Sequence, residues 1–196
     1  MFFILEPTLL LSPFGIIESA WGGTKIECWI PKQRLLKYEG VKFPESLSAE
    51  QNKQKRPSFL YNAMVHPFQD FKIKGFLWYQ GEGNRNQPEP YNNYMKDLVG
   101  SWRSQWKNKK LPFYFVQIAP FNYAIRKNAP GMGANLIREA QLKISHEISN
   151  TGMVVTTDAG DCNEIHPSKK EIVALRLANW ALAKQYKFKD LKYRSP

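Results

Sequence analysis

The residues best suited to catalysis lie around His166. Asp158, Asp161 and Glu164 precede this histidine in the string TTDAGDCNEIHP. A carboxylate beside an imidazole fixes the tautomer and stabilises the imidazolium, while the other ring nitrogen takes a proton from a nucleophile. The cluster therefore has the residue types that acyl transfer needs. A histidine that caps or packs against a helix is the simpler alternative.

A metal centre is a weaker interpretation of the same cluster, because one histidine with irregular Asp spacing is a poor ligand motif. Cys28 and Cys162 are the two cysteines of the chain, and they form no CxxC pair. We therefore expect no metal and no cofactor. His66 and His146 fit the packing interpretation better than His166 does, because neither lies in a strand-end loop rich in carboxylates.

Two other segments could stabilise a developing negative charge. In Gln80-Gly81-Glu82-Gly83-Asn84 the glycines let the backbone approach a ligand closely, and the side-chain amides can donate to an oxyanion. The turn Trp21-Gly22-Gly23-Thr24 could offer backbone N–H groups to an anion. A hydrophilic turn and a tight strand-to-helix turn are the alternatives, and each segment alone is a weak signal.

Short apolar runs bounded by breakers indicate strands of a parallel sheet covered on both faces. The predicted strands are 14–18, 73–79, 113–118 and 153–157. Each run finishes in polar or glycine-rich residues. In an open α/β sheet the carboxyl ends of the strands meet at one edge, where ligands bind, and His166 should approach that edge from the loop after Asp158.

Helices fill the intervals between these strands. Helical spacing of apolar residues predicts amphipathic helices over 90–107 and 134–148. Pro167 followed by Ser168, with Glu171 three residues later, predicts a capping box that starts the last helix, whose apolar positions would be Ile172, Leu175, Ala178 and Leu182. Residues 31–60 have little periodicity, so we predict a surface excursion, either a loop or a small insertion.

Length and composition fit one domain of 196 residues, with 43% hydrophobic residues to build a core. The net charge of +11 suits a lysine-rich solvated surface at least as well as nucleic acid, because no nucleic-acid-binding motif accompanies it. We expect no nucleic-acid partner. No run reaches the length of about 18 apolar residues that a membrane span needs, so we expect no membrane partner either. The apolar start lacks a basic region and a convincing cleavage site, so we predict no signal peptide and leave the compartment open.

Several blocks, taken in order, resemble the sialate O-acetylesterase family of the SGNH hydrolases. The resemblance covers residues 14–186, and its combination of blocks is specific although no single block is. The blocks are GIIESAWGGT (15–24), YNAMVHPF (61–68), KGFLWYQGEGN (74–84), LPFYFVQIAP (111–120), REAQL (138–142), TGMVVTTDAGDCNEIHPSKK (151–170) and RLANWAL (176–182).

This resemblance implies a three-layer α/β/α, flavodoxin-like fold and a serine esterase that removes acetyl groups from sugar hydroxyls through an acyl-enzyme. It implies that His166 is the catalytic base and that Gly22 or Gly23 supplies the backbone oxyanion donor. Gln80 and Asn84 would form the side-chain donor block, whose loop Glu82 orders. No cofactor is implied, and the partner is an acetylated carbohydrate.

The chain departs from the family pattern in two places. The family carries its nucleophile in an early GQSN-type motif, and the chain has no such motif, no GxSxG and no GDS. The first strand and the nucleophile are therefore expected to be missing. Ser19 and Cys162 are poor substitutes. Near the base, Asn163 and Glu164 stand where relatives commonly have Asp, which leaves Glu164 as the nearest carboxylate and Asp161 as a fallback.

The predicted organisation is an atypical, displaced start at 1–13, an esterase-like domain at 14–186 with the excursion at 31–60, and a basic tail at 187–196. The first hypothesis is an esterase domain whose full-length form is active. The second is a noncatalytic fragment or carbohydrate-binding remnant, and we expect the 196 residues alone to be inactive. An exposed sheet edge left by a missing strand would favour self-association.

Overall fold

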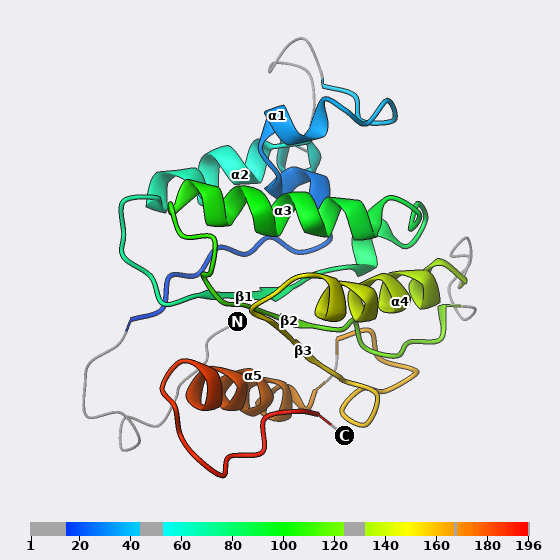
Figure 1. Ribbon diagram of the computed structural model, residues 1–196. Coiled ribbons are helices and arrows are strands. Elements are labelled where there is room, and N and C mark those ends of the chain that lie inside the picture. Colours follow the sequence, from blue (N-terminus) through cyan, green and yellow to red (C-terminus); the bar gives the residue numbers. More distant parts are fainter. Residues whose placement is uncertain (1–14, 44–52, 124–131, 167, 196) are drawn as a thin grey trace.

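The computed structural model describes residues 15–43, 53–123, 132–166 and 168–195, in which a parallel sheet lies between helices (Figure 1). The α-helices and strands are α1 (Lys32–Leu35), α2 (Phe59–Met64), β1 (Phe76–Tyr79), α3 (Tyr91–Gln105), β2 (Phe113–Val116), α4 (Met132–Glu147), β3 (Thr151–Val154) and α5 (Lys170–Lys184). Short 3-10 turns occur at Ile26–Trp29, Lys53–Lys55, His66–Phe68 and Glu82–Asn84.

The sheet has the order β1-β2-β3, and both pairings are parallel. Phe76 of β1 is aligned with Phe113 of β2, which is aligned with Thr151 of β3. The connections are long enough to contain α3 and α4, as parallel neighbours require. All three strands therefore point their carboxyl ends to the same edge, as the sequence predicted.

The central strand β2 explains why the core has two layers. Phe113 and Phe115 belong to the large core cluster with α3 and α4, whereas Tyr114 and Val116 belong to a smaller cluster with α5. All four β2 side chains are buried, because both faces of a parallel sheet are covered. The predicted α/β/α layering is confirmed, with α3 and α4 above the sheet in Figure 1 and α5 below it.

Aromatic side chains from the sheet and α3 build the centre of the large cluster. The Trp102 ring of α3 lies 5.1 Å from the Phe76 ring and 5.5 Å from the Trp78 ring, centroid to centroid. Edge and tilted contacts at these distances are favourable for aromatic pairs. The helix predicted over 90–107 forms with its predicted inward face: Tyr91, Tyr94, Met95, Leu98 and Trp102 are all buried.

Other predicted boundaries are wrong. The described residues of the predicted strand at 14–18 form no strand, and Ile16 and Ile17 are 46% and 45% exposed. An apolar run becomes a strand only where a neighbour supplies hydrogen-bond partners, and none of the described strands pairs with it. The strand predicted at 153–157 instead spans Thr151–Val154, and it starts two residues earlier because Thr151 already pairs with Phe113.

The start and the buried face of the last helix also differ from the prediction. Helix α5 begins at Lys170, Lys169 is its N-cap, and no side chain caps it, so the predicted capping box is absent. Val173, Leu177 and Leu182 are buried. Of the predicted positions, Ile172 and Leu175 are instead 36% and 60% exposed. Apolar residues cover several faces of this helix, so spacing alone did not identify the one that packs.

The segment 31–60 contains more structure than a loop. Leu35 of α1 is fully buried, and the Tyr38 hydroxyl donates a 2.6 Å hydrogen bond to Asp97 of α3. Lys37 Nζ also lies 2.9 Å from Asp97. These contacts attach α1 to the outer side of α3. Residues 44–52 of the excursion lie outside the described residues, and so does the predicted start at 1–13.

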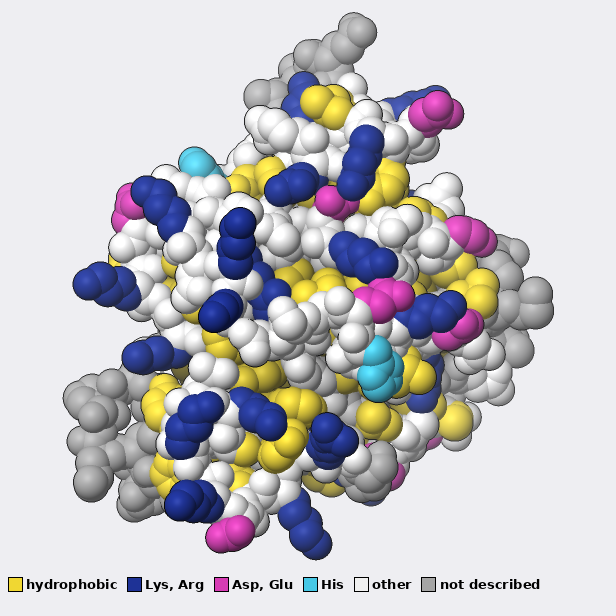
Figure 2. Space-filling view, in the orientation of Figure 1, with side chains coloured by type: hydrophobic (Ala, Val, Ile, Leu, Met, Phe, Trp, Pro, Cys, Tyr) yellow, Lys and Arg dark blue, Asp and Glu magenta, His cyan; other side chains and the backbone are white. Residues whose placement is uncertain are grey.

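Basic side chains are spread over the surface. Figure 2 shows Lys and Arg over both the α3 and the α5 sides of one face, where Asp and Glu are fewer. No helix in the described part of the chain is long and apolar enough to cross a membrane.

Candidate active site

The loop after β1 and the segment around Thr24 meet at the carboxyl edge of the sheet. Gln80 directly follows β1, and its Nε2 donates to the Thr24 carbonyl at 3.0 Å and to Asn84 Oδ1 at 2.8 Å. Gly83 lies against the same carbonyl: a Cβ on Gly83 would stand 2.6 Å from the Thr24 oxygen. Two predicted site segments, 56 residues apart at Gln80 and Thr24, are therefore in contact.

Asn84 completes this connection and is only 1% exposed. Its Nδ2 donates to Glu27 Oε2 at 2.7 Å, and its Oδ1 accepts from the backbone N–H of Ile26 at 2.9 Å. The side chains of Gln80 and Asn84 thus donate to protein acceptors rather than point into solvent. In this arrangement the two amides connect the 80–84 loop to the 24–27 segment.

The predicted oxyanion glycines form an exposed turn beside this buried network. Gly23 has a φ of +69°, which favours glycine, and nothing would touch a Cβ on Gly22 or Gly23 within 4 Å. Thr24 Oγ1 closes the turn by donating to the Trp21 carbonyl at 2.8 Å, and it accepts from Trp29 Nε1 at 3.1 Å. Both glycines are therefore exposed, and buried Thr24 fixes one end of their turn.

Tyr91 of α3 and Gln141 of α4 hold the Gln80 loop, and neither was predicted as a site residue from the sequence. The Tyr91 hydroxyl is 2.9 Å from the Gln80 carbonyl and 3.1 Å from Gln80 Oε1. Gln141 Nε2 donates to the same carbonyl at 3.0 Å, and its Oε1 accepts from the Ile118 N–H at 3.0 Å. Both residues are fully buried, so each hydrogen bond satisfies a group that would be costly to leave unpaired.

The sequence contains signals that could have identified Tyr91, Gln141 and Glu27. The sequence pattern predicts Tyr91 only as a core aromatic of its helix, and the resemblance implies no role for Gln141 of the REAQL block. Glu27, the acceptor for Asn84, stands three residues after Thr24 in GGTKIE. A glutamine at an inward helical position is the kind of signal that marks a polar connection, because a buried amide needs partners.

Glu82 is the half-buried acidic residue of the loop. Burial raises its pKa, and a hydrogen bond to its own backbone N–H and the charges of His166 and Arg85 act in the opposite direction. Arg85 Nη1 donates to the Glu82 carbonyl at 3.1 Å. The Glu82 carboxyl therefore interacts electrostatically with the proposed base, although the two residues come from loops that follow different strands.

His166 lies at the surface with its side chain 84% exposed. Its Nδ1 is 4.0 Å from Glu164 Oε1, and its backbone N–H donates to the same oxygen at 3.0 Å. Asp161 instead accepts from the backbone N–H of Asn163 at 2.8 Å. Of the two predicted carboxylates, the structure brings Glu164 to the imidazole and gives Asp161 a turn contact.

The Ser19 hydroxyl is engaged in a hydrogen bond and the Cys28 thiol is protonated, whereas Cys162 is exposed. Ser19 Oγ donates to the Met64 carbonyl at 2.6 Å. Burial raises the pKa of the Cys28 thiol to about 12, so it stays protonated at neutral pH. Cys162 is exposed, and its carbonyl accepts from the Asn122 N–H at 2.7 Å. Within the described ranges, no group of three or more His, Cys, Asp or Glu side chains could hold a metal ion.

Comparison with known proteins places the chain in a family. The family model "Carbohydrate esterase, sialic acid-specific acetylesterase" matches residues 8–183. Sialate O-acetylesterase of Homo sapiens is 33% identical over 211 residues, which cover 94% of this chain and 38% of the human protein. The Mus musculus sialate O-acetylesterase is 31% identical over 227 residues, covering 94% and 41%.

Two solved structures are also similar to this chain. A carbohydrate acetylesterase from Xanthomonas citri has a TM-score of 0.80 and 34% identity, covering 97% of this chain and 40% of its own. A protein from Arabidopsis thaliana has a TM-score of 0.51 and 25% identity, covering 70% and 58%. The chain spans about two fifths of the length of the curated relatives it matches. It belongs to the carbohydrate esterase family of sialic acid-specific acetylesterases.

Proposed function

We propose that the protein that contains this chain hydrolyses acetyl esters on sugar hydroxyls. The observation that carries the proposal is the contact between the two predicted oxyanion segments, through the 3.0 Å hydrogen bond from Gln80 Nε2 to the Thr24 carbonyl. This contact fixes the exposed Gly22–Gly23 turn next to the loop whose Glu82 interacts with His166. The family supports the same chemistry.

In the proposed mechanism, a serine hydroxyl attacks the acetyl carbonyl carbon while His166 takes the hydroxyl proton. Backbone N–H groups at Gly22 or Gly23 stabilise the oxyanion of the tetrahedral intermediate. The C–O bond to the sugar breaks, and His166 returns the proton to the leaving sugar oxygen. Water, deprotonated by His166, then attacks the acetyl-serine and releases acetate and free serine.

The assignment of carboxylates is part of the proposal. Glu164 Oε1 accepts a hydrogen bond from the backbone N–H of His166 and lies 4.0 Å from its Nδ1. Both contacts support Glu164 as the partner that orients the imidazole. The charge of Glu82 provides a second stabilising interaction for the imidazolium. Asp161 is proposed to shape the turn before the histidine, because its Oδ1 accepts from Asn163.

We further propose that these 196 residues alone do not turn over substrate and act at most as a carbohydrate-binding part. The GQSN-type motif is absent from the sequence. Ser19 donates to Met64, and the Cys28 thiol is protonated, which supports neither as the attacking group. Self-association through the outer edge of β1 belongs to the same proposal, since a sheet missing a strand leaves backbone groups unpaired.

Acetate release from acetylated sialic acid and from acetylated xylan tests both parts. The full-length protein should be active, and His166→Ala should lower kcat by about a hundredfold or more, the usual scale for a general base. Glu164→Gln should lower it less. The 196-residue chain should release no acetate, and Ser19→Ala in the full-length protein should leave the rate unchanged. Activity in the short chain that is lost in both Ser19→Ala and His166→Ala would identify Ser19 as the nucleophile and overturn the second part.

A further inference from the structure

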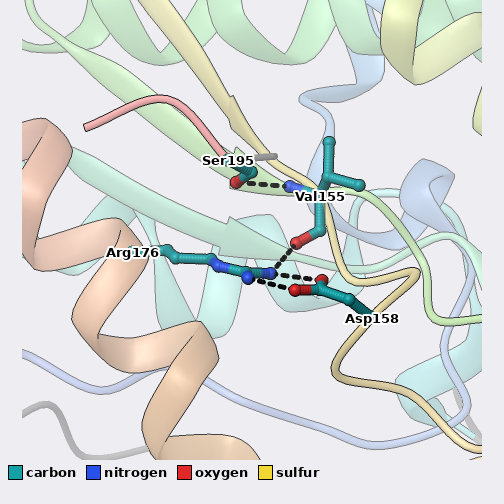
Figure 3. A network of polar contacts seen from close by, with 4 residues as sticks. All are labelled: Val155, Asp158, Arg176 and Ser195. Carbon is teal, nitrogen blue, oxygen red and sulfur yellow. Dashed lines mark hydrogen bonds and ion pairs between the residues drawn. The ribbon is translucent and has the colours of Figure 1, made fainter. Parts of the chain in front are cut away.

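Arg176 of α5 joins the two ends of the loop that carries His166. This loop leaves β3 at Val155 and enters α5 after Lys169. The guanidinium Nη1 donates to the Val155 carbonyl at 2.8 Å and to Asp158 Oδ1 at 2.7 Å, and Nη2 lies 2.5 Å from Asp158 Oδ2 (Figure 3). One side chain of the helix that follows the loop therefore holds both a backbone group and a carboxylate at the start of the loop.

This pair differs from an ordinary surface salt bridge. Exposed ion pairs contribute little, because water screens them and both side chains lose freedom. The Asp158 side chain is 50% exposed, but the Arg176 side chain is only 15% exposed, and its planar fork matches the carboxylate with two bonds while a third reaches the backbone. The Arg176 guanidinium also holds the pKa of Asp158 down to about 2, so the carboxylate stays charged at every moderate pH.

The C-terminal segment reinforces the same position. The backbone N–H of Val155 donates to Ser195 Oγ at 3.0 Å (Figure 3). The segment reaches this point along α5: the Tyr193 ring lies 4.7 Å from the Trp180 ring, and Lys184 Nζ lies 4.5 Å from the Tyr193 ring centroid. Residues predicted as a basic tail, beyond the 8–183 match to the family model, thus pack on α5 and reach the base of the loop.

The exposure of His166 makes these anchors important. Its side chain is 84% exposed, so packing around the imidazole fixes it little. The first part of the loop is held more firmly: Thr156 Oγ1 donates to the Gln117 carbonyl at 2.9 Å, and Ala159 is 2% exposed. The position of the histidine relative to the Gln80 loop must then depend on the separation of the two loop ends, which Arg176 sets.

We propose that Arg176, with Asp158 and Ser195, positions the His166 loop for catalysis. Arg176 is a positioning residue that acts through the loop and does not touch substrate. The catalytic consequence rests on the proposed function, whereas the ordering of the loop by Arg176 does not. The single ammonium group of lysine cannot make the bonds of the planar guanidinium. Arg176→Lys should therefore keep only part of the loop ordering that Arg176→Ala loses.

The first test uses the 196-residue chain and requires no activity. Amide hydrogen exchange is compared for wild type, Arg176→Ala, Arg176→Lys and Ser195→Ala. The matched control is Lys143→Ala, which removes an exposed ion pair to Glu139 within α4. Arg176→Ala should speed exchange in residues 155–166 by about tenfold, the factor expected for a lost charge-assisted bond, and leave β2 and α3 within about twofold. Ser195→Ala should have a smaller effect in the same residues, and Lys143→Ala none.

The second test measures kcat and KM of the full-length protein on an acetylated sugar. Arg176→Ala should lower kcat with little change in KM, Arg176→Lys should recover part of the loss, and Lys143→Ala should match wild type. Unchanged exchange in 155–166 would overturn the inference, as would equal loss of protection throughout the sheet. Wild-type protein without esterase activity would overturn the proposed function instead, and the exchange result would still decide whether Arg176 orders the loop.

Discussion

The amide side chains of Gln80 and Asn84 are already committed to protein acceptors. Both Nε2 hydrogens of Gln80 are used, one on the Thr24 carbonyl and one on Asn84 Oδ1. A direct contact from Gln80 to an acyl oxyanion would require one of these bonds to break. Backbone N–H groups of the Gly22–Gly23 turn need no such exchange, and they are therefore the better proposed donors.

Asn84→Asp should destabilise the fold strongly at neutral pH. The change removes the donor to Glu27 and places a second carboxylate 2.7 Å from the first in a site only 1% exposed. We expect a loss of about 2–4 kcal/mol in the free energy of unfolding, measured by urea denaturation. Asn86→Asp, on the exposed part of the same loop, is the control and should change stability little. Equal stability of the two variants would show that Asn84 does not carry the connection.

Glu82→Gln should raise the melting temperature at neutral pH. Burial raises the pKa of Glu82, so charging this carboxyl costs more free energy in the folded state than in the unfolded state. Stability is then greatest below the ordinary carboxyl pKa and decreases as the pH rises toward the folded-state pKa. Glutamine removes this cost, and its advantage should shrink as the pH falls toward 4.5, the ordinary value.

Calorimetry from pH 4 to pH 8 measures this difference, with the exposed Glu89→Gln as the control. A Glu82→Gln variant that is less stable than wild type at neutral pH would mean that the charged carboxylate stabilises the fold through His166 and Arg85. In the full-length esterase the same variant should be slower, because the imidazolium would lose a stabilising charge.

Contact between the loop after β1 and the Thr24 segment depends on the lack of a side chain at Gly83. A Cβ there would stand 2.6 Å from the Thr24 carbonyl oxygen, a backbone atom that cannot move without displacing the turn. Gly83→Ala should therefore lower stability by about 1–3 kcal/mol and weaken the Gln80 to Thr24 hydrogen bond.

Gly100→Ala is the matched control for this change. Gly100 lies on the exposed face of α3, and nothing would contact its Cβ within 4 Å. Alanine there should stabilise the protein by about 0.5–1 kcal/mol, because glycine has the greater freedom to lose on folding. Opposite signs for the two variants in urea denaturation are expected, and a stabilising Gly83→Ala would contradict the close approach.

Elements with a single dominant period were predicted well from the sequence. The α3 helix has one inward stripe, and the central strand β2 is apolar throughout, so each could adopt one arrangement. The strand predicted at 14–18 and the start and inward face predicted for helix α5 were wrong because their outcome depends on neighbours: a strand needs a partner, and a helix apolar on several faces packs where the sheet lies. Polar connections such as Gln141 to Gln80 could not be predicted, since they join helix and loop at a distance of 61 residues.

The whole molecule has an uneven covering of its sheet. Helices α3 and α4 cover one face, whereas α5 covers β2 and β3 on the other face, through Val173 and Leu177. Leu77 of β1 points to that second face and is 44% exposed. Among the described strands β1 is paired on one side only, with β2. An edge strand with an exposed apolar side chain favours pairing with another chain.

Leu77→Lys should reduce self-association of the 196-residue chain. Charged side chains on an edge strand oppose edge-to-edge pairing, because association would bury or crowd the charge. Sedimentation velocity over a concentration series should show oligomers for wild type and mainly monomer for Leu77→Lys. Leu36→Lys is the control: Leu36 is 64% exposed at the end of α1, away from the sheet, and its variant should associate as wild type does. A wild-type chain that is monomeric at all concentrations and melts cooperatively would show that the outer edge of β1 does not drive association.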